Sequence, residues 1–163
     1  MSRLFAFPPI IGQSPHLLIL GTMPGARSLQ EGQYYAHPQN QFWRFMGDIY
    51  GALPSLPYRE RTEILIEHGI AVWDVLQSCI REGSLDSSIQ HAEANDFPAF
   101  FKTYPTIKHV VFDSLTAEKI FFRQKFELPS NIAFHRVPSP SPAYASLRYE
   151  EKLKIWQQVL TSL

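Results

Sequence analysis

The chain of 163 residues contains one cysteine, Cys79, and equal numbers of basic and acidic side chains, so its formal net charge is zero. A single cysteine excludes an intramolecular disulfide and any metal site or iron–sulfur cluster built only from cysteines. A neutral chain also lacks the basic excess typical of proteins that bind nucleic acid mainly through phosphates. It can still contact a few phosphates through backbone amides and hydroxyl groups.

The sequence has no apolar run approaching the length of about 18 residues that a membrane-spanning helix needs, so we expect no membrane partner. Its N-terminal segment does not combine a basic stretch with a long apolar run, and no signal peptide is expected. A lone thiol fits a reducing compartment. These observations predict a cytoplasmic protein.

Common catalytic signatures are also missing. The chain contains no G-x-S-x-G elbow, no phosphate-binding loop, no H-E-x-x-H and no G-x-G-x-x-G. Its histidines are too scattered to indicate a metal site. Ser139, His135 and Asp113 could form a serine hydrolase triad only in an order and spacing that match no known pattern.

Short apolar segments alternate with helical patterns along the chain, without repeats or a long linker. We expect strands at residues 17–20, 70–75, 109–112 and 132–137, helices at 40–50, 59–68, 96–103, 116–126 and 148–160, and an irregular lead-in over 1–15. Such alternation is typical of a parallel sheet covered on both faces. The sequence therefore predicts a single α/β domain over residues 1–163, a three-layer α/β/α structure with about four parallel strands.

Two segments follow predicted strands and are rich in turn-forming residues. Gly21 to Gly25 reads G-T-M-P-G after the first strand, and Pro138 to Ala143 reads P-S-P-S-P-A after the last. Ligands bind beyond the carboxyl ends of the strands in sheets of this kind. We therefore expect both segments at one functional edge of the molecule.

Residues 34–43 read Y-Y-A-H-P-Q-N-Q-F-W and place aromatic rings and a carboxamide just ahead of a predicted helix. A carboxamide beside aromatic rings suits holding a flat polar ring and positioning a water, rather than binding a metal or forming an acyl-enzyme. Asn40 also precedes helical spacing, so it can act as the helix cap. Both roles are compatible. For His37, the proline and aromatic context favours a structural role.

These segments also carry a family resemblance. G-x-x-P-G after an apolar strand, followed by Y-Y-x-H-P-x-N-x-F-W, resembles the uracil-DNA glycosylase superfamily, and in particular its hypoxanthine-DNA glycosylase branch. Two further segments match: W-D-V with S-C and G-S-L-D-S over residues 73–87, and V-P-S-P-S-P-A over 137–143. The resemblance spans residues 17 to 160, nearly the whole chain. The ordered set of four segments is specific for the family, and less so for the substrate.

The resemblance implies a catalytic role for Asn40, which would orient the water that attacks the sugar. It also implies that Tyr35 stacks on an extruded base, while Tyr34 packs in the core. Gly21, Thr22 and Met23 would form the base-binding wall, with backbone amides near a base carbonyl. Met23 stands where the mismatch-specific uracil enzymes carry a catalytic asparagine, so their mechanism is not expected here.

The resemblance further implies DNA contacts by Gly25, Ser28, Pro138, Ser139 and Ser141. The prolines stiffen the second segment, which suits pressing on a phosphate, although the same residues could form a plain rigid connector. Tyr144 is one candidate for a wedge that enters the duplex, and the sequence does not identify the wedge residue. Val137 replaces a histidine that is frequent at its place in the superfamily and helps uracil to leave. Asp74 could orient a loop or contact the base, and its buried-strand pattern favours a structural role.

The sequence therefore predicts a monofunctional DNA glycosylase that hydrolyses the N-glycosidic bond of a deaminated base in base excision repair, with hypoxanthine as the expected base. The alternatives are a uracil or xanthine glycosylase, an inactive nucleic-acid-binding relative, and a hydrolase of free nucleosides. The expected partner is DNA that contains a deaminated base. No cofactor is expected because the nucleophile is water, and no lysine in the matched segments can form a Schiff base. We expect a monomer.

Overall fold

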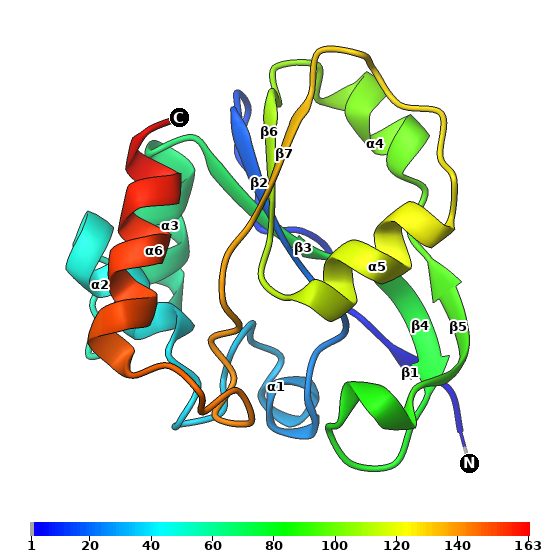
Figure 1. The fold of residues 1–163 in the computed structure, drawn as a ribbon, viewed down its shortest axis with the longest axis horizontal. Helices are drawn as coiled ribbons and strands as arrows, with labels where there is room; N and C mark the ends of the chain where they lie inside the picture. Colours follow the sequence, from blue (N-terminus) through cyan, green and yellow to red (C-terminus); the bar gives the residue numbers. More distant parts are fainter. Residues whose placement is uncertain (1) are drawn as a thin grey trace.

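The computed structural model describes residues 2–163 (Figure 1). Its central sheet contains four parallel strands in the order β3–β2–β6–β7, with β2 paired to both β3 and β6. These strands are β2 (Leu17–Gly21), β3 (Ile70–Asp74), β6 (His109–Phe112) and β7 (Ala133–Arg136). The predicted α/β class and its four-stranded parallel sheet are confirmed.

Helices cover both faces of this sheet (Figure 1). One layer contains α2 (Phe42–Tyr50), α3 (Tyr58–Glu67) and α6 (Tyr149–Thr161), and the other contains α4 (Phe97–Thr103) and α5 (Leu115–Arg123). The side chains of β2 alternate between the two layers: Leu17 and Ile19 pack with α2 and α6, whereas Leu18 and Leu20 pack with α4 and α5. A strand buried on both faces explains the uninterrupted apolar run in the sequence.

The helix ends follow local signals that the sequence carries. Asp96 accepts a hydrogen bond from the Ala99 amide at 3.1 Å and thereby caps α4 at the start of the predicted helix. Gly51 ends α2 with φ of 81°, a left-handed conformation that glycine adopts without steric cost. The bounds of the five predicted helices are correct to within three residues.

Several short elements were not predicted from the sequence. They are α1 (Ala26–Glu31), the 3-10 turn η1 (Asp86–Ser88) and a small antiparallel sheet of β1 (Leu4–Phe5), β4 (Leu76–Ile80) and β5 (Gln90–Ala94). The lead-in over residues 1–15 was expected to be irregular, but it contributes β1 and an isolated bridge between Ile10 and Val72. β1 is defined by pairing with the distant strand β4, and β5 is mostly exposed without apolar alternation.

The carboxyl end of the sheet gathers segments that lie far apart in the sequence. In Figure 1, β2 runs down to α1, while the chain after β7 reaches the same lower edge before it enters α6. The turn η1 lies beside them. Within residues 2–163, no helix has the length and apolar character needed to cross a membrane.

Candidate active site

A cavity of about 960 Å³ opens at the carboxyl end of the sheet. Its volume lies near the upper end of the range of about 300–1,000 Å³ typical of ligand sites. Nine of the ten predicted site residues line it, from the first strand turn, α1, the loop before α2 and the chain after β7: Thr22, Met23, Gly25, Ser28, Tyr35, Asn40, Pro138, Ser139 and Ser141. The expectation that these segments meet at one edge therefore agrees with the geometry.

Gly21 is the tenth residue, and it lies behind the cavity wall. A Cβ atom at this position would stand 2.7 Å from Asp74 Oδ1, 2.9 Å from Asp113 Oδ2 and 3.3 Å from the Tyr35 hydroxyl. The absence of a side chain thus allows three polar groups to approach the end of β2. Gly21 contributes this space, and its carbonyl accepts a hydrogen bond from Val75 N at 2.8 Å.

Asn40 stands one residue before Gln41, which is the N-cap of α2, and its side chain caps the first amide of the helix. Asn40 Oδ1 accepts a hydrogen bond from Phe42 N at 2.9 Å, while the backbone N–H of Asn40 donates to His37 O at 2.9 Å. The half-buried side chain also lines the cavity. A carboxamide oxygen has two lone pairs, so Oδ1 can accept a second hydrogen bond while it holds the Phe42 amide. This contact at the start of the helix is therefore compatible with holding a water.

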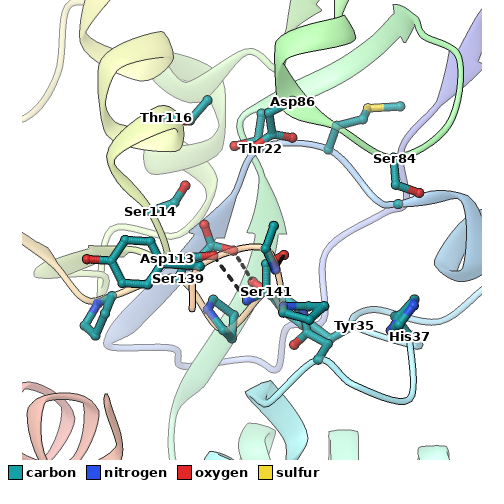
Figure 2. Close-up of a pocket in the computed structure, with 18 of the residues that line it drawn as sticks. Thr22, Tyr35, His37, Ser84, Asp86, Asp113, Ser114, Thr116, Ser139 and Ser141 are labelled. Carbon is teal, nitrogen blue, oxygen red and sulfur yellow. Dashed lines mark hydrogen bonds between the residues drawn. The ribbon is translucent and has the colours of Figure 1, made fainter. Parts of the chain in front are cut away.

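Tyr35 has an unusual backbone conformation with φ of 55°, in the left-handed region that few non-glycine residues occupy. Its ring stacks on Phe42 with centroids 4.0 Å apart, and its hydroxyl donates to Asp113 Oδ2 at 2.8 Å (Figure 2). Burial, followed by the charge of Asp113, raises the pKa of Tyr35 well above its usual value. Tyr35 thus remains a neutral donor with one ring face covered.

The loop that carries Tyr35 is held by neighbouring side chains. The buried hydroxyl of Ser28 accepts from Ala36 N at 3.0 Å, and the hydroxyl of Tyr58 accepts from Tyr34 N at 3.0 Å. Tyr34 itself is 5% exposed and donates to Pro8 O at 2.9 Å, as suits a packing residue. Ser28 was predicted to contact DNA, and within the protein its hydroxyl supports the shape of this loop.

The segment Pro138–Tyr144 is stiffened by hydroxyl groups as well as by prolines. Ser139 Oγ accepts from Ser141 N, and Ser141 Oγ accepts from Ala143 N, both at 3.2 Å. Each hydroxyl keeps its own hydrogen for a further acceptor. The Pro140 carbonyl accepts from Gln41 N at 2.9 Å and thereby connects this segment to the neighbour of Asn40.

The apolar part of the cavity wall includes Met23, which is 7% exposed and packs with Leu76 and Cys79. A flexible thioether at this position gives an adaptable surface. Val137 is 2% exposed and also lines the cavity. Neither side chain can orient a water or donate a hydrogen bond to a departing base.

Sequence reasoning did not assign the cavity's acidic residues to the site. Asp74, Asp86 and Asp113 all line it, and Asp74 had been expected to be structural. Ser84 lines it too, and its hydroxyl accepts from Ala26 N at 2.8 Å. Asp74 and Asp113 stand at the carboxyl ends of β3 and β6, on either side of β2, which is a signal that could have identified them.

The remaining candidate residues have other partners. His135 lies 3.2 Å from His109, ring nitrogen to ring nitrogen, and Asp113 is engaged by Tyr35. A triad of Ser139, His135 and Asp113 is therefore not formed. The exposed ring of His37 accepts from Gln39 N at 3.1 Å, which fits the structural role favoured from the sequence.

The fold and the cavity together define an α/β/α domain that can receive a flat ring beyond the carboxyl end of its parallel sheet. The family model described as the uracil DNA glycosylase superfamily matches residues 8–160. Since this match covers nearly the whole chain, the protein belongs to the uracil DNA glycosylase superfamily.

Two curated relatives and one solved structure are similar to this chain. A hypoxanthine DNA glycosylase from Methanosarcina barkeri is 42% identical over 108 residues, 66% of this chain and 68% of the relative. One from Methanosarcina acetivorans is 35% identical over 112 residues, 68% of this chain and 71% of the relative. A solution NMR structure of a candidate uracil DNA glycosylase from Methanosarcina acetivorans aligns with a TM-score of 0.74 and 28% identity, covering 98% of this chain and 99% of the other.

Proposed function

We propose that this protein is a monofunctional DNA glycosylase that releases hypoxanthine from DNA in base excision repair. The observation that carries this proposal is the position of Asn40, whose carboxamide lines the same cavity as the ring of Tyr35. The similarity to two proteins named hypoxanthine DNA glycosylase supports the choice of base. We also propose that it acts as a monomer, and that it works in the cytoplasm because its lone thiol fits a reducing compartment.

The geometry suggests a division of roles within the cavity. An enzyme that acts on a base must first extrude it, at a cost of a few kcal/mol in lost stacking and pairing. The exposed face of Tyr35 can return about 1–3 kcal/mol by stacking on the base. Asn40 then holds a water near the anomeric carbon. Ser139 and Ser141 offer their free hydroxyl hydrogens to a phosphate of the extruded nucleotide.

We expect hypoxanthine to leave faster than uracil from otherwise identical duplexes. Val137 offers no donor to a departing uracil, and Met23 cannot orient a water as asparagine does. The adaptable wall around Met23 also suits the wider purine ring. Single-turnover rates on duplexes that contain hypoxanthine, uracil or xanthine measure this preference at matched pH and salt.

The same panel separates the remaining alternatives. Faster release of uracil would contradict the choice of base while leaving the glycosylase assignment intact. Binding to all duplexes without release of any base would identify an inactive binding module. Hydrolysis of free inosine at a rate similar to that in duplex DNA would indicate a nucleoside hydrolase.

The affinity for DNA should depend weakly on salt. Each phosphate that the protein neutralises contributes a slope of about 0.9 in log affinity against log salt. The arginines near the site already have partners: Arg27 with Glu31, Arg136 with Glu118, Arg148 with Glu151, and Arg44 with the ring of Tyr149. We therefore expect a slope of roughly 2 to 4, measured by titrating salt against duplex affinity. A slope of about 10 would mean that the protein neutralises many more phosphates than expected.

A further inference from the structure

Two carboxyl groups of the cavity have no role in the mechanism above. Asp74 ends β3 and Asp113 follows β6, so they flank Gly21 at the end of the central strand β2. Both are largely buried, at 5% and 8% exposure. Within residues 2–163, neither forms a salt bridge, and the missing side chain of Gly21 leaves room for Asp74 Oδ1 and Asp113 Oδ2 beside the end of β2.

The two carboxyl groups differ in their hydrogen bonds. Asp113 Oδ2 accepts from the Tyr35 hydroxyl at 2.8 Å, a contact that favours the ionised form of Asp113. Asp74 Oδ2 is buried and has no hydrogen-bond partner within the described residues. A buried, unpaired carboxylate oxygen is costly, whereas a buried carboxylic acid carries no charge and can donate its hydrogen to a ligand.

The surrounding charges favour a proton on Asp74. Burial raises the pKa of Asp74 well above its usual value, and the charges of Asp113 and Asp86 raise it further against the opposing effect of Arg81. Burial likewise raises the pKa of Asp113 to about 7, although the Tyr35 hydroxyl opposes this shift. Two neighbouring buried carboxyls cannot both ionise easily, so one proton stays in the pair at neutral pH. The other titratable or charged groups bordering the cavity are Arg27, Tyr34, His37, Arg136 and Tyr144.

We propose that Asp74 is the general acid of the reaction and transfers its proton to the departing base. The proposal rests on the proposed function, because it requires a base that leaves with the electron pair of the glycosidic bond. When the bond between C1′ and N9 breaks, that pair moves onto the purine, and the Asp74 proton bonds to a ring nitrogen or the carbonyl oxygen of the base. Water forms the new bond to C1′ and releases a proton, and Asp74 regains one from solvent.

This role fits the chemistry of a purine leaving group. Hypoxanthine carries acceptors at N3, N7 and O6, over which the negative charge spreads as the bond breaks. The two residues placed beside the base above cannot supply a full proton: Asn40 is an amide, and burial keeps the proton of Tyr35 in place. General acids of this kind typically contribute roughly 100- to 10,000-fold to a rate. Asp113 keeps the acid protonated through its charge.

The pH dependence of the single-turnover rate tests the proposal. Asp74 acts only while it is protonated, so the wild-type rate should fall as pH rises through the raised pKa of this group. Asp74→Asn keeps the shape and a hydrogen-bond donor but has no proton to transfer. It should lose roughly 100- to 10,000-fold in rate and show no alkaline fall. Asp113→Asn should keep the fall but move it to lower pH, because the charge that raises the pKa of Asp74 is gone.

A substrate with a different leaving group separates acid catalysis from a structural role. An N7-methylated hypoxanthine already carries a positive charge and leaves without protonation, so Asp74→Asn should slow its release little. Asp48→Asn, an exposed residue outside the cavity, serves as the matched control and should leave rates and profile unchanged. Thermal melts of each variant report whether it is folded.

Either of two results would overturn the acid role. One is a wild-type rate that stays flat up to about pH 9, beyond the usual range of a raised carboxyl pKa. The other is a release rate that Asp74→Asn lowers by the same factor for the neutral base and for the methylated base. A wild-type protein that releases no hypoxanthine at any pH would instead contradict the proposed substrate. The profile is then measured on the deaminated base that the wild type does release.

Discussion

Replacing Asn40 with alanine is expected to lower the rate of base release by roughly 100- to 1,000-fold, the size of effect seen when one preorganised polar group is removed from an active site. The carboxamide acts mainly in the transition state, where the water approaches the sugar. Binding to the damaged duplex should therefore remain nearly unchanged. Single-turnover release from a hypoxanthine duplex, together with equilibrium binding, measures both effects.

The capping role of Asn40 needs a separate control. Loss of the hydrogen bond from Phe42 N to Oδ1 should cost about 1 kcal/mol of stability, well below the total of a typical domain. Asn40→Ser keeps an oxygen that can cap the helix but cannot reach as far into the cavity. It should therefore match alanine in activity and approach the wild type in thermal stability. Gln39→Ala changes an exposed neighbour and should leave both properties unchanged. Turnover near the wild-type rate in Asn40→Ala would contradict the assignment.

The fold could be predicted from the sequence because its central elements carry local signals. The strand Leu17–Gly21 is apolar throughout, since helices cover both of its faces. The edge at which the site lies followed from topology, because the segments after β2 and β7 must meet at the carboxyl end of a parallel sheet. The small sheet of β1, β4 and β5 has no such signal, because it depends on pairing between the chain's start and residues 76–94.

The candidate site could be predicted only in part for a related reason. Asn40, Tyr35 and the Ser-Pro segment stand in distinctive local patterns, and they do line the cavity. Asp74 and Asp113 become informative only when the sheet places them on either side of Gly21. The role of the Ser28 hydroxyl as a support for the Tyr35 loop is likewise a tertiary contact, which no local pattern specifies.

Replacing Tyr35 with alanine is expected to weaken binding to a hypoxanthine duplex by roughly 5- to 150-fold, which corresponds to the 1–3 kcal/mol of base–aromatic stacking. Binding to an undamaged duplex should change much less, because stacking acts only on an extruded base while phosphate contacts act on both duplexes. Both affinities are best measured in an Asn40→Ala background, so that the base is not released during the experiment.

The structure supplies the control for this experiment. The Tyr35 ring also packs on Phe42, and its hydroxyl donates to the buried Asp113, so alanine should lower thermal stability as well. Tyr35→Phe removes only the hydroxyl and keeps the ring. It should therefore preserve the preference for the damaged duplex, while the pKa of Asp113 rises further because a hydrogen bond to its ionised form is lost. Equal weakening of binding to both duplexes in Tyr35→Ala would mean that Tyr35 supports the fold or contacts DNA generally, because a stacking residue must act through the extruded base.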